Sequence, residues 1–118
     1  MTMACSVDSL PPLYSSGEFA ALPFKEADVT LCTSGVSYMH KNRYENILPP
    51  DSSRVILQNG DYINANMVNV GDCYSPMIAC QGPIESTVSD FWSMVVQYQS
   101  SAILMVTPLV ENQKITPA

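Results

Sequence analysis

Residues 78–92, with the sequence IACQGPIESTVSDFW, decide the fold that we predict for this chain. Residues 78–80 form a short apolar run typical of a strand, and a Gly-Pro pair at 82–83 ends it. Thr87 followed three residues later by Asp90 is a helix-capping pattern, in which a side-chain oxygen accepts from unpaired amides and a carboxylate meets the positive helix end. The stretch therefore predicts a strand, a tight turn and a helix.

The predicted helix has one apolar face. Its large apolar residues recur at the spacing i, i+3, i+4, i+7 and i+8: Val88, Phe91, Trp92, Val95 and Val96. Each such side chain contributes roughly 1.5–3 kcal/mol when it leaves water. We therefore expect this face to be buried against a sheet, with Phe91 and Trp92 in the core, and the helix to end near residues 99–101.

The chain before residue 53 carries weaker signals. Residues 1–16 lack periodicity and are expected to form a flexible arm, and residues 18–28 a short helix pair. Residues 30–40 are rich in Ser, Thr and Gly, which is typical of a loop. We expect a structured loop at residues 41–50 as well, because the double proline at its end stops any helix.

Four segments are predicted to be strands: residues 53–58, 62–70, 77–80 and 102–107. The dipeptide Asn59-Gly60 supplies the positive φ angles of a hairpin turn between the first two. The last segment is apolar throughout, which is typical of a central strand, yet nothing after it can cover it. We expect an α/β (or α+β) fold, with a mixed sheet of about four strands and one long amphipathic helix. Either the chain stops inside a larger domain, or the missing neighbours of the last strand come from elsewhere.

Composition narrows the class of protein. With 118 residues, 47% of them hydrophobic and 14% charged, the chain suits one small globular domain. Its net charge is −6 and only three of five basic residues cluster, so we expect no nucleic-acid partner. The longest apolar run is too short for a membrane span and the start lacks the basic residues of a secretory signal, so we expect a cytoplasmic protein.

The residues suggest neither a cofactor nor a metal. The four cysteines, Cys5, Cys32, Cys73 and Cys80, include no C-x-x-C pair and are expected to be free structural thiols. His40 is the single histidine and is expected to be a loop residue, because no ligand spacing surrounds it. The glycines match neither dinucleotide-binding nor P-loop patterns, so no phosphate cradle is encoded.

Five blocks of the sequence resemble, in order and approximate spacing, those of the protein tyrosine phosphatases. The blocks are KNRYENILP at 41–49, Asp51 with Arg54-Val55, DYINA at 61–65, QGP at 81–83, and DFW at 90–92 followed by Met94-Val95. The resemblance covers roughly residues 41–114 and corresponds to the first half of a catalytic domain. It implies that residues 17–118 form a partial phosphatase domain with an incomplete phosphatase-like fold.

The resemblance also implies site residues and a partner. Tyr44 would line a pocket and stack on the phosphotyrosine ring of a protein or peptide, and Asn46 would hydrogen-bond the substrate backbone. By composition alone, Tyr44 is an exposed loop tyrosine. Two of the motif residues, Arg43 and Arg54, are implied to be salt-bridged rather than phosphate-binding. All the other motif residues are implied to be mainly structural as well, and the full set is Asn42, Arg43, Arg54, Tyr62, Asn64, Gln81, Gly82, Pro83, Asp90, Phe91 and Trp92.

The reactive groups of that family are missing from these residues. Its chemistry needs a Cys followed six positions on by an Arg, and an acidic residue after Trp-Pro. Pro11, Tyr38, Ala79 and Ser86 stand six positions after the four cysteines, and Ser93 follows the single tryptophan. Three hypotheses stay open: a phosphatase family member or fragment that is inactive alone, a noncatalytic phosphotyrosine-binding or regulatory module (a pseudophosphatase), or a truncated product without a stable fold.

Overall fold

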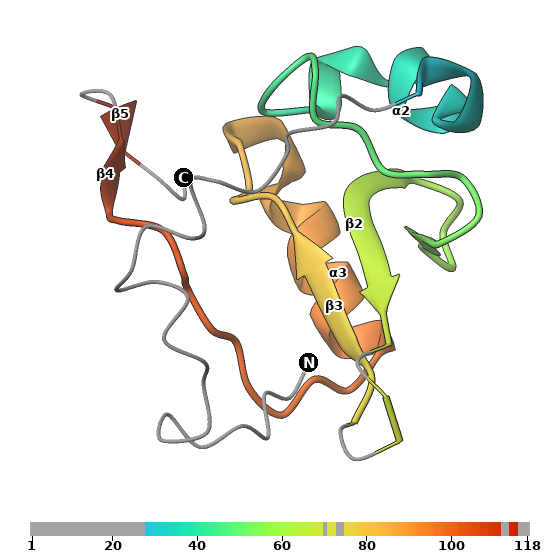
Figure 1. Ribbon diagram of the computed structural model, residues 1–118. Coiled ribbons are helices and arrows are strands. Elements are labelled where there is room, and N and C mark those ends of the chain that lie inside the picture. The colour runs from blue at the N-terminus through green and yellow to red at the C-terminus, as the bar shows by residue number, and fades with distance from the viewer. Residues whose placement is uncertain (1–27, 70, 73–74, 112–113, 116–118) are drawn as a thin grey trace, which may run out of the picture.

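The computed structural model describes residues 28–69, 71–72, 75–111 and 114–115. Its centre is a three-stranded antiparallel sheet in the order β1-β2-β3. The strands are β1 (Arg54–Ile56), β2 (Tyr62–Val68) and β3 (Met77–Cys80). Helix α3 (Val88–Gln97) runs behind the sheet, and β3 lies between β2 and the segment that leads from residue 100 toward the C-terminus (Figure 1).

The hairpin between β1 and β2 is confirmed. Gly60 adopts a φ of +84°, which favours glycine, and its backbone N donates to the carbonyl oxygen of Leu57 at 3.0 Å. The side chain of Asn59 accepts from the backbone N of Asp61 at 2.9 Å. Ile56 therefore lies opposite Tyr62, and the register brings Ala65 of β2 opposite Cys80 of β3.

The core lies between this sheet and α3. Its buried apolar residues are Val55, Leu57, Ile63, Ala65, Ile78 and Met94, with Cys80 and Phe91 packed against them. The predicted position of Phe91 is thus confirmed. Along β2 the core residues Ile63 and Ala65 alternate with residues that face the other way, as strand geometry requires.

The prediction for the helix face is wrong in part. Trp92 is 53% exposed and Val96 75% exposed, whereas Met94 is buried at 4%. The polar Asp90 also turns inward, 5% exposed, and its carboxylate lies 3.1 Å from the Nζ of Lys41. The buried face therefore includes a paired carboxylate, which a pattern of apolar spacing does not take into account.

The helix also begins differently from the prediction. A 3-10 helix, η5 (Glu85–Thr87), precedes α3, and the Thr87 side chain makes no cap hydrogen bond to α3. Its hydroxyl instead accepts from the backbone N of Ile84 at 2.9 Å. Helix α3 ends at Gln97, slightly before the predicted end.

Residues 30–40 are helical, which corrects the predicted loop. The elements are η3 (Val29–Leu31), α2 (Thr33–Ser37) and η4 (Met39–Lys41). The carboxylate of Asp51 accepts from the backbone N of Thr33 at 2.9 Å and of Ser34 at 3.0 Å, and so caps α2. Because the capping residue lies 18 positions from Thr33, no local signal shows this helix.

The predicted mixture of helices and a sheet is confirmed, but residues 102–107 form no strand, so the central sheet has three antiparallel strands and not about four. Ile103, Leu104 and Met105 are each nearly half exposed, and Val106 is 82% exposed. A strand needs a neighbour with which to share backbone hydrogen bonds, and no strand is paired with these residues in the part of the chain that the structure describes. Farther on, β4 (Val110–Glu111) pairs with β5 (Lys114–Ile115).

Some predictions fall on residues that the structure does not describe. These are the arm at 1–16, nearly all of the helix pair at 18–28, and the thiols of Cys5 and Cys73. Among the helices of the described residues, none has the length and apolar character that crossing a membrane requires. No set of three metal-ligating side chains gathers within the described ranges.

The corrected helix face predicts opposite outcomes for two substitutions. Met94→Ala removes a side chain that is 4% exposed and should lower the free energy of unfolding by about 2–5 kcal/mol. Val96→Ala, at a position 75% exposed, should change it by less than about 0.5 kcal/mol. Urea denaturation of both variants measures these changes. If the two variants lost similar free energies of unfolding, the face predicted from the sequence would be the buried one after all.

The Asp51 cap predicts acid sensitivity. Hydrogen bonds from the Thr33 hydroxyl and from the backbone N of Ser34 and Thr33 lower the pKa of Asp51 to about 2. Because this folded-state pKa lies below the unfolded value of about 3.9, the stabilisation is present above about pH 4 and disappears as the pH falls toward 2. Asp51→Asn should therefore lower the melting temperature at neutral pH and flatten its fall between about pH 5 and 2. Circular dichroism measures the melting temperature of both proteins at each pH. If the melting temperatures of the variant and the wild type fell in parallel over this range, the prediction would be wrong.

Candidate functional site

The two residues predicted to contact a substrate lie in one short turn. Residues 44–47 form this turn, closed by the backbone N of Ile47, which donates to the carbonyl oxygen of Tyr44 at 3.4 Å. The side chain of Tyr44 is 44% exposed, and Asn46 is exposed as well. We call residues 44–47 the recognition turn. The turn places both predicted contact residues on the surface within three positions of each other.

Two buried amides hold the sheet side of the recognition turn. The Oδ1 of Asn42 accepts from the hydroxyl of Tyr62 at 2.6 Å and from the Nδ2 of Asn64 at 3.0 Å. The same Nδ2 of Asn64 donates to the carbonyl oxygen of Ile47 at 2.8 Å. One side chain of β2 therefore ties Asn42, two positions before the turn, to Ile47, the last residue of the turn.

Tyr62 stays a hydrogen-bond donor over the whole physiological range. Burial raises its pKa to about 12, and Arg54 and the Asn42 hydrogen bond oppose this increase. The ring of Tyr38 stacks on it with centroids 5.2 Å apart and planes 5° from parallel. The phenol therefore keeps its proton and keeps donating to Asn42.

Arg43 attaches the other side of the turn to the connection between β3 and α3. Its Nε donates to the carbonyl oxygen of Gly82 at 2.9 Å and its Nη2 to that of Pro83 at 2.7 Å. Its backbone N donates to the Oε1 of Gln81 at 2.9 Å. The guanidinium is thus directed at backbone carbonyls rather than at the salt bridge that we expected.

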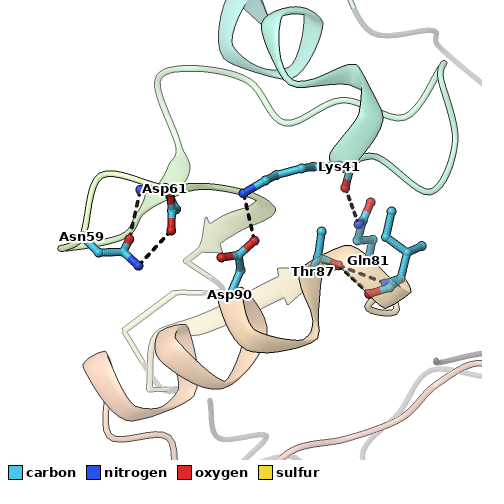
Figure 2. A network of polar contacts seen from close by, with 7 residues as sticks. Lys41, Asn59, Asp61, Gln81, Thr87 and Asp90 are labelled. Carbon is cyan, nitrogen blue, oxygen red and sulfur yellow. Dashed lines mark hydrogen bonds and ion pairs between the residues drawn. The ribbon is translucent and has the colours of Figure 1, made fainter.

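A second attachment runs from η4 to α3. The Nζ of Lys41 lies 3.1 Å from the Oδ2 of Asp90, with side chains 17% and 8% exposed (Figure 2). The backbone carbonyl of Lys41 also accepts from the Nε2 of Gln81 at 2.9 Å. Sequence reasoning did not single out Lys41, because its partner lies 49 residues away.

The described cysteines are poorly suited to nucleophilic chemistry. Burial is the first cause of a raised pKa for both Cys32 and Cys80, and nearby Asp51 and Asp28 raise that of Cys32 further. Both are free thiols, and Cys32 is buried with its Sγ 3.9 Å from the carbonyl oxygen of Leu48. A nucleophilic cysteine needs the opposite shift, because the thiolate is the reactive form.

Two surface hollows lie away from the recognition turn. One, of about 330 Å³, lies between β3 and residues 103–107, and Gln81, Gly82 and Pro83 also line it. The other, of about 550 Å³, lies between the β1–β2 hairpin and the outer face of α3, where Trp92 is found. Neither Tyr44 nor Asn46 lines either hollow.

Arg54 is half-buried in β1, opposite Asn66 of β2.

Comparison with known proteins identifies the family of this chain. A family model described as protein-tyrosine phosphatase matches residues 38–117. Tyrosine-protein phosphatase 3 of Dictyostelium discoideum is 49% identical over 81 residues, which cover 63% of this chain and 8% of that protein. Human tyrosine-protein phosphatase non-receptor type 4 is 39% identical over 104 residues, which cover 83% of this chain and 11% of that protein.

The fold has a solved counterpart. The catalytic domain of human protein tyrosine phosphatase non-receptor type 18 superposes with a TM-score of 0.65 at 36% identity, over 71% of this chain and 33% of that chain. The present chain thus spans about a tenth of the length of these curated relatives and a third of the solved domain. The family match, the sequence identity and the shared fold agree, and the chain belongs to the protein-tyrosine phosphatase family.

Proposed function

We propose that these 118 residues supply the recognition side of a tyrosine phosphatase domain and bind phosphotyrosine-containing proteins or peptides. The observation that supports this is the recognition turn. Its backbone is held by Asn64 on one side and Arg43 on the other, while the side chain of Tyr44 remains 44% exposed. A fixed backbone that presents an aromatic side chain loses little entropy when a ligand binds.

The two proposed contact residues would have complementary roles. The ring of Tyr44 offers a flat surface for the phosphotyrosine ring, a contact worth roughly 0.5–1.5 kcal/mol. The side-chain amide of Asn46 can both donate and accept, which suits the backbone of an extended peptide. Together they would recognise the aromatic residue and the chain that carries it.

We further propose that this chain binds without hydrolysing. The sequence contains no Cys with an Arg six positions later, and the two described thiols have raised pKa values. Hydrolysis would need a thiolate, a guanidinium on the phosphoryl oxygens and an acid for the leaving phenol. The noncatalytic binding role is therefore favoured for these residues, in a cytoplasmic protein with free thiols.

Replacing Tyr44 should weaken binding of a phosphotyrosine peptide. Tyr44→Ala should raise the Kd about 2- to 12-fold, because the ring contact is lost. Tyr98→Ala is the matched control, since Tyr98 is similarly exposed, at 39%, but lies at the end of α3. NMR titration with the peptide measures both, and equal effects of the two substitutions would argue against recognition by Tyr44.

Replacing Asn46 should weaken the binding of a phosphotyrosine peptide more than the binding of free phosphotyrosine. Asn46→Ala should raise the Kd for a phosphotyrosine peptide and leave that for free phosphotyrosine nearly unchanged, because the amide would contact the backbone of the peptide. The ratio of the two Kd values is the measurement. A parallel loss for both ligands would show that Asn46 acts on the turn and not on the peptide.

The purified 118-residue chain should not turn over an aryl phosphate such as p-nitrophenyl phosphate above the buffer rate. The physical reason is that neither described thiol is poised as a thiolate. Replacing all four cysteines by serine provides the control. Turnover that survives this replacement would mean that the assigned chemistry is wrong.

A further inference from the structure

We propose that Gln81 is a positioning residue, whose side-chain amide sets the direction in which the recognition turn presents Tyr44. This inference rests on the proposed binding function, which it extends by naming how the turn is held. Gln81 itself does not belong to the turn and lies at the end of β3, 37 positions from Tyr44. Its effect would therefore pass through the backbone of residues 41–43.

The amide of Gln81 makes a paired contact with that backbone. Its Oε1 accepts from the backbone N of Arg43 at 2.9 Å, and its Nε2 donates to the carbonyl oxygen of Lys41 at 2.9 Å. Figure 2 shows the second of these bonds beside the ion pair of Lys41 with Asp90. Asn42, between the two contacted residues, is extended, with φ −97° and ψ 133°.

This pattern imitates the pairing of a strand. In extended backbone, the carbonyl of one residue and the N–H two residues later point to the same side, where one residue of a neighbouring parallel strand offers its own N–H and carbonyl. A glutamine amide has the same donor and acceptor as a peptide group. Gln81 thus holds Asn42 extended, and the chain enters the recognition turn in one direction.

Gln81 is itself well anchored. Its backbone N donates to the carbonyl oxygen of Asn64 at 3.2 Å. Asn64 also holds the far end of the turn, through the carbonyl of Ile47. The position of the amide is therefore set by the sheet, and any movement of residues 41–43 away from it would require both hydrogen bonds to break.

The chain contains a matched control for this contact. The Nε2 of Gln97 donates to the carbonyl oxygen of Ile56 at 2.9 Å, and its Oε1 accepts from the backbone N of Gln58 at 2.8 Å. The pattern is the same, a carbonyl and an N–H two residues apart. Since Gln97 lies at the end of α3 and contacts the hairpin, its loss should leave the recognition turn intact.

The test compares Gln81→Glu with Gln97→Glu. At neutral pH a glutamate keeps the shape and an acceptor for the backbone N–H but has no donor for the carbonyl. Gln81→Glu should raise the Kd for a phosphotyrosine peptide about two- to tenfold, whereas Gln97→Glu should change it less than about twofold. The increase should shrink in a Tyr44→Ala background, because the two residues would act through one contact.

A pH series adds a signature that general destabilisation would not produce. Below its own pKa, ordinarily about 4.3, the introduced carboxyl regains a proton to donate, so binding by Gln81→Glu relative to wild type should recover as the pH falls from about 6 to 4. The amide of the wild type does not titrate. Because both proteins bind the same ligand, titration of the ligand phosphate cancels when the Kd of the variant is divided by the Kd of the wild type at each pH. If this variant does not fold, the neutral Gln81→Met should show the same loss without recovery.

A measurement without ligand separates the two proposals. Amide hydrogen exchange of the free protein should accelerate at Ile47 in Gln81→Glu, although the backbone N of Ile47 bonds to Tyr44 and not to Gln81. If the wild type binds no phosphotyrosine peptide, the proposed function fails while this exchange test still stands. Unchanged exchange at Ile47, an undiminished effect in the Tyr44→Ala background, or an equal effect of Gln97→Glu would overturn the positioning role.

Discussion

The side-chain amide of Asn42 is the contact on which the arrangement of the site depends. Its Oδ1 accepts from Tyr62 and Asn64 of β2, and its Nδ2 donates to the carbonyl oxygen of Gly35 in α2 at 2.9 Å. A buried polar group that loses its partner costs about 1–3 kcal/mol. Because Asn42 is 9% exposed, the helix and the strand must both be in place before this amide is satisfied. The geometry of the recognition turn is thus a property of the whole fold.

Close packing reinforces this dependence. A Cβ added to Gly35 would lie 3.2 Å from Leu48 and Pro49, the residues that follow the recognition turn. The short helix can approach the turn this closely only because glycine stands there. The same helix is capped by Asp51, so the stretch from Cys32 to Asp51 closes on itself, with the recognition turn inside it. Both polar contacts and close packing therefore hold this layer, and the apolar core joins the sheet to α3.

Sequence reasoning succeeded where a signal was local and failed where a partner was distant. Strand β3 and the Asn59-Gly60 hairpin were predicted because the residues that specify them are neighbours. Helix α2 was missed, since Asp51 supplies its cap. Residues 102–107 were misassigned because hydrophobicity shows a need for burial but does not identify a partner. Family resemblance indicated Tyr44 and Asn46 as contact residues, but the spacing of residues could not show the turn that carries them or how it is held.

Recognition and reaction make different demands on a fold, so the binding role that we propose does not require a reactive thiol. Presenting an aromatic ring in a fixed direction requires a rigid backbone, which amides from Asn42, Asn64 and Gln81 provide by ordinary hydrogen bonds. Ionising a cysteine requires an electropositive environment. The described thiols lie in the opposite environment, where burial favours the neutral form. The hydrogen bonds from these amides involve neither thiol, although the buried Cys32 packs beside the turn, with its Sγ 3.9 Å from the carbonyl oxygen of Leu48.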